Sequence, residues 1–395
     1  MSAERLKRMD EVLAGYVERG VVPGLVALVS RRGALHVKVV GSTSIGGPPI
    51  HRDTIFRISS MTKPVTAAAT MVLVEEGKLR LDDPVDELLP ELAQRQVLRR
   101  VDGPIGDTEP ANRPITARDL LTFRMGFGYL FATELYPIHL AAAEAGFGPG
   151  PPRPSGDPGA DVFMHRLGAL PLMYQPGTSW LYNTSAEVLS VLIARASGRA
   201  FDVFLRERLF EPLGMKDTGF SVPAAKLDRL STSYMVDPRT RQLEVYDPAE
   251  GGDWSRPPDF PNGAGGLVST ADDYLSFTQM LMAGGRHGRL RILSRPSVEL
   301  MTTDQLTPEQ KRRSGFGPEF FADHGWGFGL QIATRRTRLA SVGSYGWSGG
   351  MGTLWESDPR EGLITILMTQ RGWESSIPAG VFVDFAALAY SAIED

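Results

Sequence analysis

The chain has 395 residues, a net charge of −4, 42% hydrophobic and 22% charged residues, a composition typical of a soluble globular protein with a large core. This mildly acidic charge disfavours nucleic acids and anionic membranes as partners, because both bind basic surfaces. Since the sequence contains no cysteine, disulfides, thiolate catalysis and cysteine-ligated metal sites are excluded.

The first residues form a charged amphipathic pattern and lack the apolar core of a signal peptide. A helix is expected over residues 2–19, and no apolar run is long enough for a transmembrane helix. We therefore expect a cytoplasmic protein with no membrane partner. Two apolar stretches follow, Leu25–Ser30 and Ala34–Gly41, and the short link Arg31-Arg32-Gly33 between them predicts a β-hairpin.

The next helix is predicted from near Ser60 to near Gly77. Residues 65–74 are apolar on almost every face, so this helix should be buried on all sides. Three later helices begin with a threonine followed three residues on by an acid, at Thr116, Thr184 and Thr270. Two glycines are the expected helix ends, Gly198 and Gly284. The Pro- and Gly-rich stretch from Gly148 to Gly159 predicts a surface loop.

The C-terminal part has the pattern of strands and turns. The expected strands are Trp326–Thr334, Leu339–Tyr345, Gly352–Glu356 and Leu363–Thr369, with a turn at residues 357–362. A last helix is expected from near Ser376, with Pro378 in its first turn. Strands near both termini with helices between them predict an α/β sandwich. One antiparallel sheet, from residues 1–59 and 262–395, would be flanked by helices and carry an inserted, mainly helical lobe at residues 60–261.

Ser60-Met61-Thr62-Lys63 is a candidate nucleophile motif of the form S-x-x-K. Residues three apart on a helix share a face, and a serine at a helix N-terminus lies where free N–H groups favour developing negative charge. A lysine in so apolar a helix is desolvated, which favours its neutral, basic form. The tetrapeptide alone is equally consistent with a serine cap and a lysine that reaches solvent.

Two further segments favour the catalytic interpretation. Tyr182 lies directly before a capped apolar helix, where its hydroxyl can relay a proton; taken alone it is equally a boundary aromatic. The segment Tyr345-Gly346-Trp347-Ser348-Gly349-Gly350 ends one predicted strand and leads to another. Its glycines permit close approach of a ligand to the backbone and offer an N–H as an oxyanion donor, or simply form a tight connection.

In this order the three segments resemble the signature of the serine β-lactamase, penicillin-binding protein and family VIII carboxylesterase superfamily. Four other stretches are similar to the same superfamily: Pro176-Gly177-Thr178, residues 210–220, residues 265–273 and residues 325–329. The resemblance spans nearly the whole chain. It implies a β-lactamase/transpeptidase-like fold with the site between the α/β part and an all-helical lobe.

The resemblance also implies roles for individual residues. Ser60 would be the nucleophile, Lys63 its partner, and Tyr182 the general base or proton shuttle. The N–H groups of Ser60 and Gly350 would form the oxyanion hole. The substrate would be bound by Trp347, Ser348, Gly349 and Tyr129, the last on a loop that shapes the pocket.

Three positions depart from the superfamily pattern. The asparagine usually found two residues after the tyrosine is Thr184, an expected helix cap, and Asn183 is one position off. Residues 120–126 replace a common His-Thr-Ser-Gly segment. The lysine or histidine of the third motif is Trp347, which has no charge to hold a substrate carboxylate. A Trp-Gly-Gly-like third motif is typical of family VIII esterases.

We therefore expect a serine carboxylesterase that cleaves short-chain or aryl esters through an acyl-enzyme on Ser60, with no cofactor and no metal. β-Lactamase, D-Ala peptidase or amidase, or acyltransferase activity at the same site is the alternative, and a non-catalytic acyl-binding relative is a third interpretation. Gly346-Trp347-Ser348-Gly349-Gly350 also matches the G-x-S-x-G elbow of α/β-hydrolases, but no histidine follows Ser348 to complete that triad. The physiological acyl and alcohol groups and the oligomeric state have no readable signal.

Overall fold

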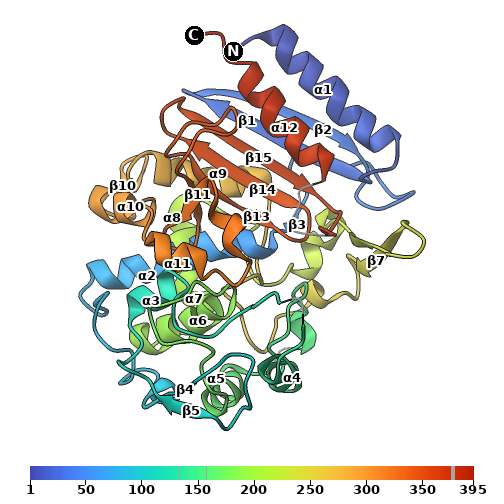
Figure 1. Cartoon of the computed structure of the whole chain (residues 1–395). Coiled ribbons are helices and arrows are strands. Elements are labelled where there is room, and N and C mark those ends of the chain that lie inside the picture. Colours follow the sequence, from blue (N-terminus) through green and yellow to red (C-terminus); the bar gives the residue numbers. More distant parts are fainter. Residues whose placement is uncertain (133, 157, 375–378) are drawn as a thin grey trace.

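The computed structural model describes residues 1–132, 134–156, 158–374 and 379–395. Its centre is a seven-stranded antiparallel sheet built from both ends of the chain, in the order β11-β12-β13-β14-β15-β1-β2 (Figure 1). These strands are β1 Gly24–Arg31, β2 Ala34–Gly41, β11 His324–Trp326, β12 Gln331–Ala333, β13 Tyr345–Gly349, β14 Thr353–Asp358 and β15 Leu363–Thr369. The predicted sheet assembled from both termini is confirmed.

The hairpin of β1 and β2 shows how local sequence sets register. Arg31 pairs with Ala34, which leaves a two-residue loop of Arg32 and Gly33. Both loop residues have positive φ, 48° and 89°. This is the left-handed conformation that a tight hairpin turn requires, and glycine adopts it without strain. The predicted hairpin is therefore confirmed.

Strand β1 is buried on both faces, and its alternating side chains divide between two cores. Leu25, Ala27 and Val29 pack with helices α1 (Ala3–Glu18) and α12 (Gly380–Ser391). Val26 and Leu28 belong to the larger core on the opposite face, where α9 (Ala271–Met282) contacts β15 and β1. Figure 1 shows α1 and α12 lying together along one side of the sheet, next to both chain ends.

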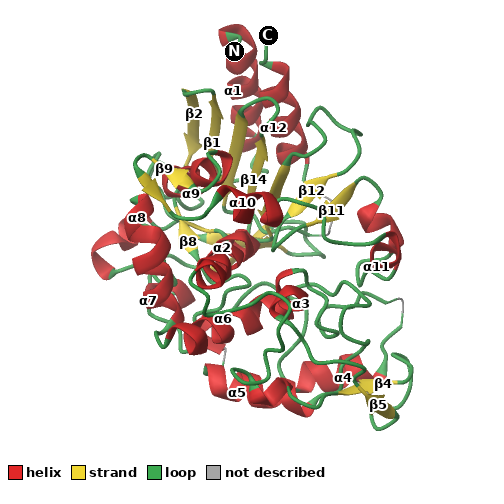
Figure 2. Cartoon of the chain, turned by 90° about the vertical axis from the view of Figure 1, so that its left-hand side faces the viewer, coloured by secondary structure: helices red, strands yellow, loops and turns green. Residues whose placement is uncertain are grey.

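The remaining helices lie mostly on the other side of the sheet from α1 and α12. Figure 2 shows α3 to α7 below the sheet, with α2 between them and the sheet. These helices are α2 Thr62–Glu75, α3 Ala117–Leu121, α4 Pro137–Glu144, α5 Ala160–Ala169, α6 Thr184–Ser197, α7 Phe201–Leu205, α8 Glu211–Leu213, α10 Arg295–Met301 and α11 Pro308–Arg312. Every strand of the main sheet lies outside residues 60–261, and the assignment of those residues to a separate lobe stays a prediction.

Short elements connect these layers. The paired short strands are β3 Phe56–Arg57 with β8 Val268–Ser269, β4 Gln96–Leu98 with β5 Thr108–Pro110, β6 Ser233–Val236 with β7 Leu243–Asp247, and β9 Arg286–His287 with β10 Leu290–Arg291. The short helical turns are η1 Ser59–Met61, η2 Pro90–Leu92, η3 Pro154–Gly156, η4 Arg206–Phe210, η5 Ala224–Arg229, η6 Asp253–Ser255 and η7 Pro318–Phe321. Of these, β3 and η1 matter most here, because they lead directly into α2.

Most predicted helix boundaries are confirmed. Helix α2 is buried from Thr62 to Leu73, as its uniformly apolar sequence requires. Thr116 and Thr270 cap α3 and α9 through their side chains, and Gly198 ends α6 in the left-handed conformation. The expected helix start at Ser376, with Pro378 in the first turn, lies outside the described residues.

Two predicted strands are wrong. The expected strand over residues 326–334 is a hairpin of β11 and β12, because Gly329 takes a positive φ of 70° and residues 327–330 turn back. The expected strand over residues 339–345 is a loop, and β13 begins only at Tyr345. Gly343 there has a φ of 90°, and the N–H of Ser341 bonds the Asp358 carboxylate, so a loop hydrogen bond replaces strand pairing.

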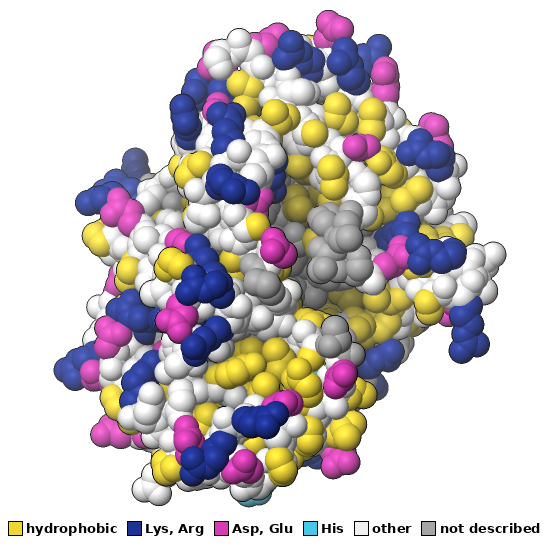
Figure 3. Space-filling view, in the orientation of Figure 1, with side chains coloured by type: hydrophobic (Ala, Val, Ile, Leu, Met, Phe, Trp, Pro, Cys, Tyr) yellow, Lys and Arg dark blue, Asp and Glu magenta, His cyan; other side chains and the backbone are white. Residues whose placement is uncertain are grey.

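The Gly148–Gly159 stretch is irregular except for the turn η3, as predicted, and Asp157 within it lies outside the described residues. Tyr246 holds it in place by donating a hydrogen bond to the carbonyl of Pro152 at 2.9 Å. In the part of the chain that is described, no helix is long and apolar enough to span a bilayer. Charged side chains of both signs are mixed over the face seen in Figure 3, with apolar side chains gathered on its lower half.

Candidate active site

Ser60 lies in the turn η1, between strand β3 and helix α2, and its side chain is half-buried. The residue before it, Ser59, has a φ of 45°, a conformation that is unfavourable for a non-glycine residue. Strain of this kind persists only where the surroundings enforce it. Here strand β3 pairs with strand β8, and this pairing directs the chain from β3 into the turn.

Lys63 lies one helical turn after Ser60 and is fully buried. Its Nζ is 3.0 Å from Ser60 Oγ, 2.9 Å from Asn183 Oδ1 and 2.6 Å from the carbonyl oxygen of Ala264. Burial lowers the pKa of Lys63 from 10.5 to about 7, and the negative charge of Glu187 opposes this shift. Ser60 and Lys63 lie next to each other, as predicted. The lowered pKa of Lys63 results from the desolvation that was also predicted.

The three oxygen partners of Lys63 Nζ suit either charge state of the amine. Asn183 Oδ1 and the Ala264 carbonyl are acceptors only, so each takes one N–H from the amine. An ammonium ion can donate to all three oxygens, whereas a neutral amine has two N–H bonds and a lone pair that then faces the Ser60 hydroxyl. In its neutral form Lys63 therefore has the geometry of a general base for Ser60.

Tyr182 is the third polar side chain beside Ser60 and Lys63. Its hydroxyl accepts a hydrogen bond from Trp347 Nε1 at 2.7 Å and also has Ser60 as a hydrogen-bond partner. Burial raises the pKa of Tyr182 above its usual value, while the hydrogen bonds with Ser60 and Trp347 lower it. The Nζ of Lys63 lies 4.4 Å from the centre of the Tyr182 ring. The tyrosine therefore contacts serine, lysine and tryptophan at once.

Asn183 is the residue that sequence reasoning placed in doubt. It stands at the N-cap position of α6 with a φ of 80°, and its side chain makes no cap hydrogen bond. The side chain turns to Lys63 instead. Thr184, expected to be the cap, is the first residue of the helix and is buried, so that prediction is wrong. In the sequence, adjacency to Tyr182 is the only signal for the contact between Asn183 and Lys63.

The third motif lies against the turn that carries Ser60. A Cβ on Gly349 would lie 2.2 Å from the carbonyl oxygen of Ile58, so only glycine permits this contact between β13 and the chain before Ser60. A Cβ on Gly350 would approach nothing closer than 4.0 Å, the nearest atom being Ser59 Oγ. Gly350 is exposed and adjoins the nucleophile turn, where its N–H was expected.

The pleat of β13 separates two of the expected substrate contacts. Trp347 pairs with Trp355, and both side chains lie on the face of Tyr182 and α9. Ser348 pairs with Leu354, which packs on the α1–α12 side, so the Ser348 side chain points to the other face. The Trp347 side chain therefore lies on the same face of the sheet as the site, whereas the Ser348 hydroxyl lies on the opposite face.

Aromatic side chains form one wall of the site. Tyr129 lies beside Tyr182, because its N–H bonds the Tyr182 carbonyl at 2.8 Å and the ring centres are 6.2 Å apart. Trp326 packs edge-on against Trp347 at 4.7 Å. Sequence reasoning did not assign the rest of this wall, Phe123, Trp180, Phe316, Phe320, Phe321 and Trp326. In the sequence, this aromatic wall was indicated only by the similarity of residues 325–329 to the superfamily.

Among the described residues, no group of three or more histidines or acids is placed to hold a metal ion. The polar groups gathered in the site are Ser60, Lys63, Tyr182 and Asn183. A half-buried hydroxyl, a desolvated amine and a phenol within reach of one another are suited to nucleophilic attack with proton relay.

Comparison with known proteins places this site in a family. The family model for Beta-lactamase matches residues 9–377. The chain is 40% identical over 375 residues to Protein Rv1367c of Mycobacterium tuberculosis, covering 93% of this chain and 90% of that one. It is 29% identical to Esterase EstB of Burkholderia gladioli, covering 94% and 92%. In three dimensions it is similar to EstCE1, described as a hydrolase with promiscuous acyltransferase activity, with a TM-score of 0.78, 22% identity and 98% of each chain covered.

Proposed function

The chain belongs to the beta-lactamase family, and on that premise we propose that it is a carboxylesterase that works through an acyl-enzyme on Ser60. Its fold is the β-lactamase/transpeptidase-like fold, and its superfamily contains serine hydrolases and acyltransferases. The observation that carries the proposal is the 3.0 Å contact between Lys63 Nζ and Ser60 Oγ, with the other partners of the amine both acceptors.

The proposed reaction follows from this contact. Ser60 Oγ attacks the ester carbonyl while its proton passes to Lys63, and Tyr182 delivers a proton to the departing alkoxide. The N–H groups of Ser60 and Gly350 stabilise the oxyanion. Water then attacks the acyl-enzyme by the reverse proton path and releases the acid. Lys63 and Tyr182 are coupled, so their titrations belong to the pair.

The preference for a neutral ester rests on Trp347. Superfamily members that bind a substrate carboxylate use a cation at this position, whereas Trp347 offers an indole that is already bonded to Tyr182. Its neighbours are aromatic rings, among them Trp326 and Tyr182. Such a wall stabilises apolar acyl or aryl groups and supplies no charge to offset the desolvation of a carboxylate.

The test is a panel of p-nitrophenyl esters from acetate to octanoate, run beside nitrocefin with wild-type protein and Ser60→Ala. We expect ester turnover that exceeds nitrocefin turnover, and a loss of about 10³-fold or more in Ser60→Ala. Ester hydrolysis that survives in Ser60→Ala at the wild-type rate refutes the proposal. Faster nitrocefin turnover assigns a β-lactamase instead. Absence of a Ser60 adduct in intact mass after fluorophosphonate treatment identifies a non-catalytic, acyl-binding relative.

Transfer of the acyl group to an alcohol is the second candidate, because EstCE1 is described as having acyltransferase activity beside hydrolysis. Both reactions share the acyl-enzyme and differ in whether water or an alcohol attacks it. Adding an alcohol acceptor at increasing concentration during ester turnover separates them. A product ester that grows at the expense of the free acid assigns transfer, and a constant yield of free acid assigns hydrolysis.

A further inference from the structure

Two asparagine side chains near Lys63, those of Asn183 and Asn262, bond one carboxylate, that of Glu187 in helix α6. Asn183 Nδ2 donates to Glu187 Oε1 at 3.1 Å, and Asn262 Nδ2 donates to the same oxygen at 3.2 Å. Asn183 contacts Lys63 directly, whereas Asn262 acts through the neighbouring Ala264. Glu187 stands one turn after Asn183 on the same helix, so the geometry of α6 itself brings the first pair together.

Each asparagine amide is oriented by this carboxylate. A carboxylate accepts hydrogen bonds only, so an amide beside it must present its NH2 and point its oxygen away. For Asn183 that oxygen then faces Lys63 Nζ. For Asn262 the oxygen accepts the N–H of Ala264 at 2.8 Å, the residue whose carbonyl accepts from Lys63 Nζ. One carboxylate thereby orients an asparagine that contacts the amine and an asparagine that holds the residue bearing its other acceptor.

The loop at residues 262–264 is held between α2 and α6 close to this network. The N–H of Gly263 bonds Ser190 Oγ at 2.7 Å, and Thr66 Oγ1 bonds the Gly263 carbonyl at 2.8 Å. A Cβ on Gly263 would lie 2.6 Å from Ser190 Oγ, so the loop packs directly on both helices. The backbone at Gly263 and Ala264 is therefore held by packing on the two helices and by the Asn262 side chain.

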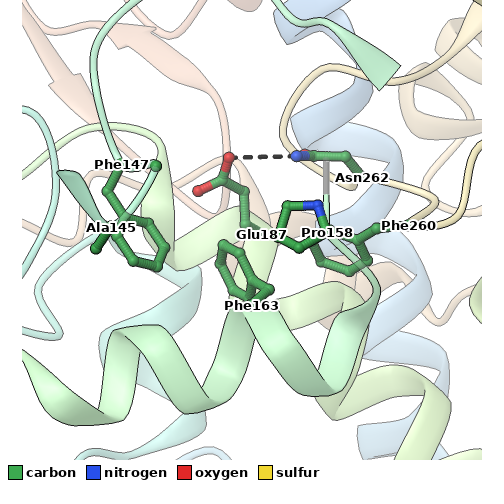
Figure 4. A pocket seen from close by; sticks show the side chains of 8 residues that line it. Ala145, Phe147, Pro158, Phe163, Glu187, Phe260 and Asn262 are labelled. Carbon is green, nitrogen blue, oxygen red and sulfur yellow. Dashed lines mark hydrogen bonds between the residues drawn. The ribbon is translucent and has the colours of Figure 1, made fainter. Parts of the chain in front are cut away.

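Glu187 lies at a small pocket with a cavity volume of about 30 Å³, lined by Phe147, Phe163, Phe260 and Asn262 among others and not by Ser60. Figure 4 shows the carboxylate extending from its helix toward Asn262, with the phenyl rings around it. The carboxylate is half-buried, whereas Lys63 is fully buried. The negative charge thus stands between a small pocket and the buried amine.

We propose that Glu187 is a positioning residue of the acylation site: it orients Asn183 and Asn262 and supplies a negative charge that favours the ammonium form of Lys63. This inference rests on the proposed function, because it assigns Lys63 the role of base. Among the described residues, the titratable side chains that face Lys63 are Tyr182, whose pKa burial raises, and Glu187. The charge of Glu187 raises the pKa of Lys63, against the larger lowering by burial.

Two substitutions separate the charge of Glu187 from its geometry. Glu187→Gln keeps an oxygen that accepts from both amides but removes the charge, so the acid limb of kcat/KM should move to lower pH by roughly 0.5–1 unit. Glu187→Ala removes the common acceptor as well, and we expect an additional loss of about 10- to 100-fold at the alkaline plateau. Glu144→Gln is the matched control, because Glu144 precedes Ala145 of the same pocket and lies outside the network.

The measurement is the pH dependence of ester turnover and of the rate of fluorophosphonate labelling of Ser60, in all four proteins. An acid limb in Glu187→Gln that coincides with wild type, in a folded protein, overturns the inference, as does an equal shift in Glu144→Gln. Loss of labelling at every pH with no shift shows a structural role only and also overturns it. If the proposed function itself is wrong, the result is different: ester turnover then persists in Ser60→Ala.

Discussion

The indole Nε1 of Trp347 donates a hydrogen bond to the hydroxyl of Tyr182 at 2.7 Å. Tyr182 also has Ser60 as a hydrogen-bond partner, so its phenol oxygen is held between the indole and the nucleophile. The residue that replaces a substrate-binding cation therefore orients the proposed proton relay.

Trp347→Phe should lower kcat with little change in KM. The substitution keeps an aromatic ring against Trp326 but removes the donor to Tyr182, and we expect about a 10-fold loss in kcat for p-nitrophenyl butyrate. Trp373→Phe is the control, because its Nε1 has no hydrogen-bond partner in the described part of the chain. A kcat unchanged by Trp347→Phe contradicts a role for this hydrogen bond.

The pH profile of kcat/KM should rise with an apparent pKa near 7. Burial lowers the pKa of Lys63 to about 7, and the neutral amine is the reactive form, so activity falls as pH drops through this value. The profile is measured with an ester whose own hydrolysis is slow from pH 5 to 9. A limb near pH 4–5 points to a carboxylate base and refutes the assignment of Lys63.

Lys63 should also make stability depend on pH. Its pKa is about 7 in the folded protein and 10.5 in the unfolded chain, so between these values the unfolded state binds more protons. The free energy of unfolding therefore increases with pH in this window, by up to about 1.4 kcal/mol per pH unit. Urea unfolding at pH 7 and pH 9 should show this gain in wild type and lack it in Lys63→Met. Equal pH dependence in the two proteins rules the effect out.

Substitution of the two glycines after Trp347 and Ser348 should have opposite results. Gly349→Ala places a methyl group against the Ile58 carbonyl and must push β13 away from the nucleophile turn, so we expect activity to fall about 100-fold or more. Gly350→Ala meets no close atom and keeps the N–H, so activity should stay within a few-fold of wild type. Both are compared by kcat/KM and by melting temperature. An equal loss of kcat/KM in the two variants would contradict this prediction.

The buried ion pair of Arg57 and Asp247 should stabilise the approach to Ser60. Arg57 Nε bonds Asp247 Oδ2 at 2.7 Å, and burial lowers the pKa of Arg57. Asp247→Asn leaves the guanidinium without its counter-charge and should cost about 3–5 kcal/mol in urea unfolding. Asp102→Asn, in an exposed pair with Arg100, serves as the control and should leave the urea midpoint unchanged. A midpoint unaltered by Asp247→Asn is the result against this prediction.

Much of the fold follows from local sequence. The β1–β2 hairpin follows from two apolar stretches around a link whose last residue is Gly33, and the burial of α2 follows from residues that are apolar on every side. The strands that were wrong, at residues 326–334 and 339–345, show the limit of such reasoning. An apolar stretch indicates that a segment is buried, but the hydrogen-bond partners that distinguish a strand from a loop come from elsewhere in the chain.

By itself, the sequence predicted that Ser60 and Lys63 share a face, because side chains three residues apart on a helix are neighbours. It also indicated Tyr182 and Trp347, through motifs read in order. Only the tertiary structure decided what surrounds the amine. Asn183 and Ala264 lie 120 and 201 residues from Lys63, and Asn183 in turn donates to Glu187. A buried amine takes its charge state from every group around it, so its chemistry is settled only when the whole chain has folded.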